Sequence, residues 1–168
     1  MARYKVMHDR GAREYTVVLD SGESVVEVLL EFARAHELPS ASFTATGGFS
    51  GCTLAFYDVR EKRYLDIPVH EQCEALSVTG SIGRSEGGDW TVHIHAVVGL
   101  RDGSTRGGHL RHAVVRPTLE VVVSESARPL SRRLDPETGL HLLDLGADDQ
   151  VVEHDPLRHG LAPPTGHR

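Results

Sequence analysis

The sequence predicts an α+β domain in which a mostly antiparallel β-sheet packs against one main helix. One observation is the helical spacing of apolar residues within residues 25–36. The other is a series of segments, spread over residues 41–145, that are rich in β-branched residues and separated by short turn signals. The 168 residues suit a single domain with a sizeable core, which we expect to span residues 1–145.

The first expected elements are a strand at residues 14–19 and then the helix. Residues 24–27 read Ser-Val-Val-Glu, which fits a capping box, and Ser21 is a rival N-cap. The apolar residues that fall on one helical face are Val25, Val28, Leu29 and Phe32. Because Pro39 disfavours helical geometry in the residue before it, the helix should end near residues 36–38.

After Pro39 the pattern changes to strands. They are expected at residues 41–46, 52–59, 64–69, 73–82, 90–99, 110–115, 118–124 and 140–145. Pro68 suggests an edge strand, and Pro117 separates two of the strands. Gly47-Gly48 either shapes the floor of a pocket or forms a tight turn. Residues 146–168 are rich in Asp, Gly, Pro and His, so we expect a disordered tail.

The strongest chemical signal lies in the expected strand at residues 90–99. His93 and His95 are two residues apart, so both imidazoles should point to one face of a strand. Asp102-Gly103 is a turn signal, so the chain can fold back and bring His109 beside the pair. Three neutral imidazoles are a common zinc shell that leaves a fourth position for water or a ligand. The alternative is that these are ordinary surface or core histidines.

Several motifs in a fixed order resemble the plants-and-prokaryotes-conserved (PPC) domain. They are Gly22-Glu23, Leu29-Leu-Glu-Phe-Ala33, Thr46-Gly47-Gly48-Phe49, Cys73-Glu74-Ala-Leu-Ser77-Val-Thr-Gly80, His93-Ile-His95, Gly107-Gly108-His109-Leu110 and Leu119-Glu120-Val-Val-Val123. The resemblance covers roughly residues 14–145. It implies an antiparallel α+β domain that assembles as a homotrimer, with zinc or another divalent metal held by His93, His95 and His109.

The resemblance also has consequences for activity. The wider fold group includes a zinc-dependent acetolactate decarboxylase and a zinc-dependent ester hydrolase with a similar three-histidine arrangement. Plant members carry an AT-hook before the domain and bind AT-rich DNA. This chain lacks the Arg-Gly-Arg-Pro core of that hook, and because the segment before the domain is short we expect no added module there. Arg111 and His112 directly after His109 also depart from the expected pattern.

Charged residues near these motifs have two interpretations each. Glu74 could be a partner of an imidazole or a general acid-base, or it could face water at a strand end. Glu120 is either buried and paired or turned outward. A small anionic ligand could be attracted by the three arginines that flank the site, Arg101, Arg106 and Arg111. The densest basic cluster reads as a solvated face, and it consists of Arg128, Arg132 and Arg133.

Composition excludes several classes of protein. The net charge of −6 argues against a general affinity for nucleic acid. No apolar run is long enough to span a bilayer, and residues 1–8 lack a signal-peptide core, so we expect a cytoplasmic protein. Cys52 and Cys73 are then expected to be reduced thiols.

Three functions follow from this sequence, in decreasing order of support. The first is a metal-binding homotrimer of unassigned activity. The second is a zinc-dependent lyase or hydrolase that acts on a small carboxylate or keto acid. The third is a DNA-binding regulator related to the plant proteins, which the acidity of the chain and the missing hook both oppose.

Overall fold

The computed structural model describes residues 3–8 and 12–145 and contains one helix and nine strands in these ranges. The helix is α1 (Val25–Ala35). The strands are β1 (Arg3–His8), β2 (Glu14–Asp20), β3 (Ser40–Asp58), β4 (Arg63–Val69), β5 (Cys73–Ser85), β6 (Trp90–Gly99), β7 (Thr105–Ser126), β8 (Ser131–Leu134) and β9 (His141–Asp144). This is the expected arrangement of mostly antiparallel strands with one helix.

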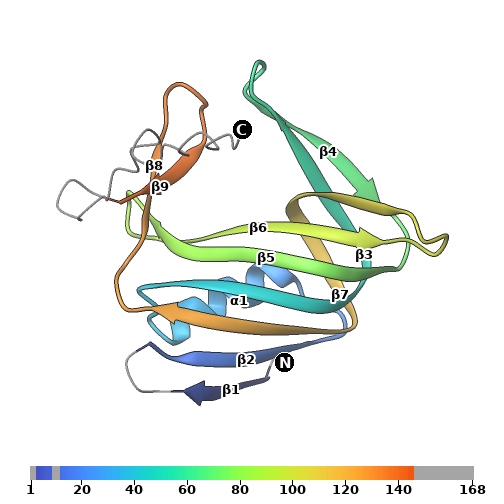
Figure 1. Cartoon of the computed structure of the whole chain (residues 1–168), viewed down its shortest axis with the longest axis horizontal. Coiled ribbons are helices and arrows are strands. Elements are labelled where there is room, and N and C mark those ends of the chain that lie inside the picture. The colour runs from blue at the N-terminus through green and yellow to red at the C-terminus, as the bar shows by residue number, and fades with distance from the viewer. Residues whose placement is uncertain (1–2, 9–11, 146–168) are drawn as a thin grey trace, which may run out of the picture.

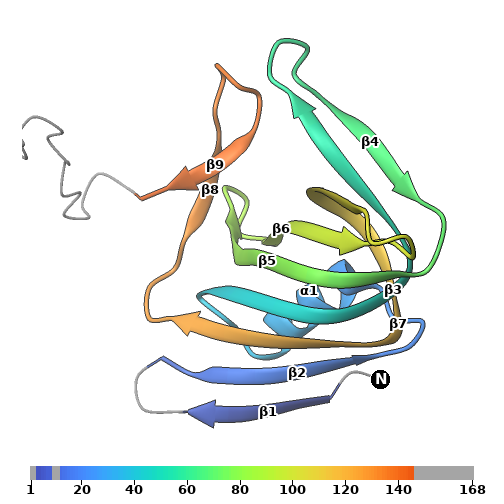
Figure 2. The same cartoon turned by 45° about the vertical axis from the view of Figure 1, so that its right-hand side comes forward.

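The sheet closes on itself around its long strands. β3 pairs with both β5 and β7, and β6 pairs with both β5 and β7, so these four strands form a ring of neighbours. β2 and β1 extend the sheet beyond β7, and among the strands of the described residues the β5–β8 pairing is the one that is parallel. Two hairpins, one formed by the end of β3 with β4 and one by β8 with β9, rise above β5 and β6 (Figures 1 and 2).

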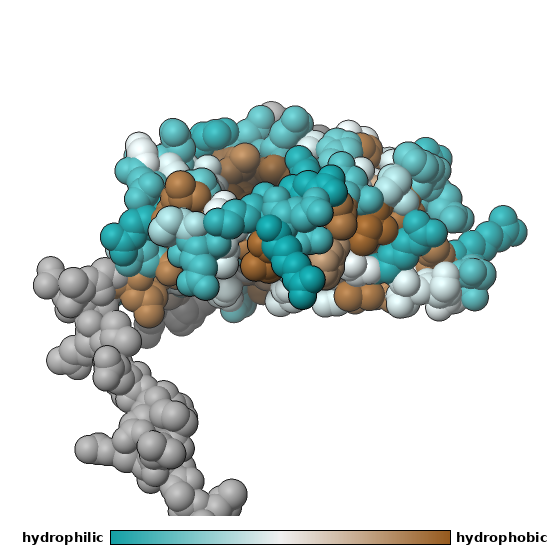
Figure 3. Space-filling model, turned by 90° about the horizontal axis from the view of Figure 1, so that it is seen from above, coloured by the Kyte–Doolittle hydropathy of each residue, from teal (hydrophilic) through white to brown (hydrophobic). Residues whose placement is uncertain are grey.

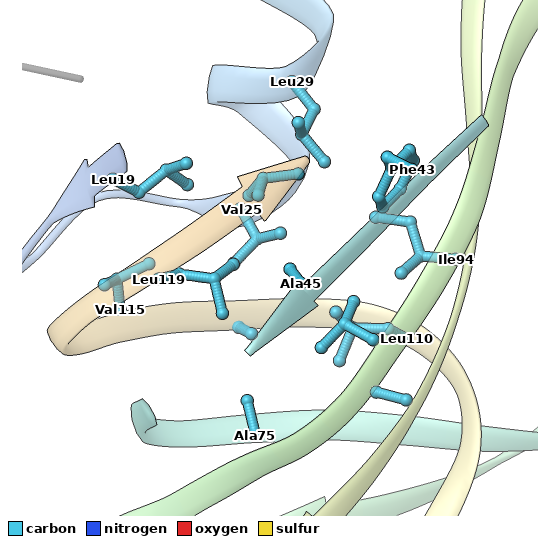
Figure 4. Close-up of a cluster of buried hydrophobic side chains, with 14 of the residues drawn as sticks. Leu19, Val25, Leu29, Phe43, Ala45, Ala75, Ile94, Leu110, Val115 and Leu119 are labelled. Atoms are coloured by element: carbon cyan, nitrogen blue, oxygen red, sulfur yellow. The ribbon is translucent and has the colours of Figure 1, made fainter. Parts of the chain in front are cut away.

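Helix α1 packs its apolar stripe against β6 and β7. Leu29 and Val25 are fully buried in the main hydrophobic cluster, which Figure 4 shows beneath the helix. Burial of each such side chain stabilises the fold by about 1.5–3 kcal/mol, which holds a short helix that would not be stable alone. Ser24 is the N-cap as expected, but its side chain makes no capping hydrogen bond, so that part of the capping-box prediction is wrong.

Two breaks that the sequence predicts do not occur. Gly47 and Gly48 lie inside β3 and form no tight turn. β3 stays paired with β5 and with β7 through this stretch, and each of these two pairings shifts its register next to Gly47. Pro117 lies inside β7, where the pairing with β3 jumps from Leu119 to Val115. A proline is tolerated at such an irregularity because no ladder hydrogen bond is required from it there.

Strand β6 separates the core from the opposite face of the sheet. Ile94, Ala96 and Val98 are buried in the hydrophobic cluster, while His93 and His95 alternate with them. Since side chains alternate between faces along a strand, both histidines lie on the face away from this cluster. The hydrophobic core therefore fixes the direction in which the two imidazoles point.

Two strands were not expected from the sequence, β1 and β8. β9 falls within the expected strand at residues 140–145 and pairs with β8. The tail predicted at residues 146–168 lies outside the described residues. Within the ranges that the structure describes, no helix has the length and the apolar character needed to cross a membrane.

We expect Glu125→Gln to lower the free energy of unfolding by about 1–2 kcal/mol at pH 7, because the side chain is 7% exposed and paired with Arg13. Arg13 donates to the carboxylate over 2.7 Å, and these bonds hold the pKa of Glu125 below its usual value. The contribution is therefore present above the unfolded pKa of about 4.3 and is lost as the pH falls through the folded pKa.

Urea denaturation of wild type and variant at pH 7 and pH 3 measures this difference. Glu61→Gln is the matched control, because the Glu61–Arg63 pair is exposed on both sides and should contribute little. A difference between wild type and Glu125→Gln that is equally large at both pH values would contradict the assignment.

Candidate metal centre

Three histidines meet on one face of the β6–β7 pair. His95 on β6 lies directly opposite His109 on β7, and His93 is the next residue along β6 on the same face. The antiparallel return that the sequence predicts is therefore observed. Among the described residues, these three form the one group of histidine, cysteine and acidic side chains close enough to hold a metal ion.

The return is made by a tight turn between β6 and β7. Leu100 donates its N–H to the carbonyl of Ser104, and Asp102 accepts hydrogen bonds from both the N–H and the hydroxyl of Ser104. Gly103 has a φ of +82°, a conformation that glycine adopts without steric penalty. This Asp-Gly turn sets the register that places His109 against His95.

Gly108 allows β7 to lie close to β3 immediately before His109. A Cβ built on Gly108 would be 2.6 Å from the carbonyl oxygen of Ala55, which is closer than real Cβ atoms approach. A Cβ on Gly107 would meet nothing closer than 3.4 Å. The second glycine of the pair is therefore the one that the site needs.

The imidazoles are close enough for shared coordination. One candidate ligand atom from each histidine lies within 4.8 Å of the other two. Ring centroids are 5.0 Å apart for His93 and His95, and 5.6 Å apart for His95 and His109. A tetrahedral zinc ion with Zn–N bonds of about 2.0–2.1 Å needs nitrogens about 3.3 Å apart. Side-chain rotations that move each nitrogen by about 1 Å would bring the three imidazoles to that spacing.

The local environment favours neutral imidazoles. Burial lowers the pKa of His109 to about 4, with smaller effects from the neighbouring histidines and arginines. Burial, followed by the charge of Arg132, also lowers the pKa of His93. His109 Nδ1 is buried and makes no hydrogen bond, which leaves a lone pair or a proton without a partner. A neutral, under-coordinated set of this kind fits a divalent metal ion.

A buried arginine that was not among the three expected flanking residues also lies beside the site. Arg101 and Arg106 are exposed, and Arg111 is exposed and paired with Asp66 at 3.3 Å. Arg132, by contrast, is 8% exposed, so its assignment to a solvated face is wrong. It donates to the hydroxyl of Ser81, which lies opposite His93. No spacing in the sequence points to Arg132, because β8 reaches the site through a parallel pairing with β5.

The other expected residues lie elsewhere. Glu74 is exposed and pairs with Gly99, four residues from His95 and so about 13 Å away along the strand. It lines a separate pocket together with Arg101, and the structure does not bring it to the histidines. Glu120 is exposed, which agrees with the outward interpretation, and His112 is exposed and lies outside the three-histidine group.

Comparisons with known proteins place this chain in a domain family. The Plants and Prokaryotes Conserved (PCC) domain, the family that the sequence motifs resemble, matches residues 7–127. A metal-containing protein from Archaeoglobus fulgidus has a structure with a TM-score of 0.73 and 28% identity, over 86% of this chain and 98% of its own. A candidate DNA-binding protein from Ralstonia eutropha has a TM-score of 0.74 and 33% identity, over 79% of this chain and 91% of its own.

A curated relative extends the comparison to longer proteins. The bifunctional protein GlmU from Synechococcus sp. (strain JA-3-3Ab) is 32% identical over 157 residues, which make up 92% of this chain. The chain spans only 23% of the length of that relative.

Proposed function

Because the chain belongs to the Plants and Prokaryotes Conserved domain family, we propose that it is a metal-binding protein whose divalent ion is held by His93, His95 and His109. The observation that carries the proposal is the convergence of three imidazoles within 4.8 Å of one another. The buried, unpartnered Nδ1 of His109 supports it, because a metal or an ordered partner is needed to satisfy that atom.

We propose zinc as the resident ion. Three imidazole nitrogens with one position left over are the usual shell of a zinc centre that remains open to a ligand. When bound, zinc would keep its double positive charge among three neutral ligands and could polarise a carbonyl or acidify a bound water. The three histidines would hold the ion, and the neighbouring Arg132 would supply further positive charge. That chemistry would suit a lyase or hydrolase acting on a small carboxylate, which is the second candidate function.

The test is the metal content of the purified protein after saturation with zinc and removal of loosely bound ion. One zinc per chain supports the proposal. Less than one zinc per ten chains would remove its basis.

We further propose that the chain assembles as a homotrimer, as its family resemblance implies. Large apolar side chains are exposed on two parts of the sheet, and Figure 3 shows apolar patches among hydrophilic residues. They include Phe56 and Val59 near the tip of the β3–β4 hairpin, and Leu76 and Val97 on β5 and β6. Where such side chains form a contiguous patch larger than a few hundred Å², they mark a contact with another protein.

Sedimentation equilibrium at micromolar concentration is expected to give three times the chain mass of 18.4 kDa. A species of single-chain mass at that concentration would contradict the trimer.

A role in DNA binding is a weaker candidate, and its support is the resemblance to the Ralstonia eutropha protein. The net charge of −6 opposes it, because phosphate contacts need a positive surface. A sub-micromolar complex with AT-rich duplex at physiological salt would favour this role over the metal-binding one.

A further inference from the structure

Residues of both hairpins and His93, one of the three histidines, line a pocket of about 540 Å³. The hairpins are the two that rise above β5 and β6 in Figures 1 and 2. His93 lines it from β6, and Arg132 lines it from β8. The two hairpins are tied together over it, because Tyr57 donates its hydroxyl hydrogen to the carbonyl of Thr138 over 2.6 Å and Lys62 donates to the carbonyl of Pro136. Its volume is in the range of small-molecule sites.

The charges around this pocket have one sign. Lys62, Arg63 and Arg132 line it, and none of its described lining residues is acidic. The ammonium group of Lys62 donates a hydrogen bond to the carbonyl of Pro136, and Arg63 forms an ion pair with Glu61 outside the pocket. Lys62 and Arg132 both lack an ion pair in the described part of the chain, and of the two only Arg132 is buried.

Arg132 is also the cation of this set that is least hydrated, because it is buried. The residue is 8% exposed, and its two hydrogen bonds go to neutral acceptors, the Ser81 hydroxyl at 2.8 Å and the His141 carbonyl at 3.3 Å. Its Nε is buried and has no acceptor, although a guanidinium carries five N–H donors. Burial lowers its pKa. The adjacent Arg133 points the other way and pairs with Asp144, so of these two neighbours on β8 it is Arg132 whose charge has no ion-pair partner.

We propose that this pocket binds a small organic carboxylate, with the guanidinium of Arg132 as the group that recognises its negative charge beside the three histidines. The planar guanidinium matches a carboxylate in shape and charge. Val92, Leu140 and Leu142 supply an apolar wall for the rest of the ligand. The inference rests on the proposed function, because it names the ligand class of the same centre. The β8–β9 hairpin that carries Arg132 lies beyond residues 7–127, where the family match ends.

The experiment is a ¹⁹F NMR titration of the zinc-loaded full-length protein with 4-fluorobenzoate and with 4-fluorobenzamide, which has the same shape but no charge. Wild type should bind the carboxylate about tenfold more tightly than the amide, the value of one charge-assisted hydrogen bond. Arg132→Gln should abolish this preference and keep the zinc, since Arg132 is not among the three histidine ligands.

Arg133→Gln is the matched control, because it removes the same charge from the neighbouring residue on the outer side of β8 and should keep the preference. If Arg132→Gln does not fold, Arg132→Lys replaces it as the test variant. Arg132→Lys should bind the carboxylate about fivefold more weakly than wild type does, because lysine lacks the planar array of N–H donors of a guanidinium. Unchanged carboxylate affinity in that variant, or no preference in wild type, would overturn the inference.

Zinc content measured on the same samples separates the two proposals. Wild type that holds zinc but has no preference for the carboxylate overturns the anion site alone. Wild type that holds no zinc overturns the metal centre, and a preference that is lost in Arg132→Gln would then still support the anion site.

Discussion

Single replacement of His93, His95 or His109 by alanine should weaken zinc binding by about 100-fold or more, because changes even in groups that only support a ligand lower metal affinity about 10–100-fold. The fold should remain, since the three imidazoles lie on the face of β6 and β7 opposite Ile94 and the buried cluster. Competition with a chromophoric chelator measures the affinity, and circular dichroism measures the melting temperature.

His112→Ala is the control for this series. His112 is on the same strand as His109 but is exposed and outside the three-histidine group, so its removal should leave zinc affinity unchanged. The assignment is wrong if the three alanine variants keep full affinity, or if His112→Ala loses zinc and His109→Ala does not.

The second large effect is expected for Gly108→Ala. The new Cβ would lie 2.6 Å from the carbonyl oxygen of Ala55, and a backbone atom cannot rotate away, so β7 must shift from β3. Overpacking of this kind costs about 1–3 kcal/mol, and the shift displaces the adjacent His109. We expect a lower melting temperature together with zinc affinity reduced by about tenfold, measured in the same competition and melting assays.

Gly107→Ala separates a steric effect from a general effect of replacing glycine. Its Cβ would meet no atom closer than 3.4 Å, so both stability and zinc affinity should stay near those of wild type. Equal behaviour of the two alanine variants would show that the close approach of β7 to β3 does not matter for the site.

The centre of the site could be predicted from the sequence because local rules determine it. A side-chain period of two places His93 and His95 on one face, and the Asp102-Gly103 turn returns the chain so that His109 lies opposite His95. The helix followed in the same way from the spacing of Leu29 and its apolar neighbours. These features depend on residues that are near in sequence.

The features that the sequence did not reveal depend on contacts between distant segments. β3 continues through Gly47 because β5 and β7 hold it from both sides, and glycine is needed there for a close approach to Thr118 and not for a turn. Arg132 is buried because the pairing of β8 with β5 at Ser85 brings its side chain to Ser81 on β5 and to the carbonyl of His141 on β9. An arginine in a polar, turn-rich stretch carries no local sign of that burial.

The X-ray absorption spectrum of the zinc-loaded protein tests the metal centre most directly, because it reports the atoms bound to the ion itself. The three-histidine centre predicts a shell of three imidazole nitrogens and one further light atom at about 2.0–2.1 Å, with the outer scattering of the imidazole rings. A shell that contains sulfur at about 2.3 Å, or six oxygens without imidazole scattering, would contradict it.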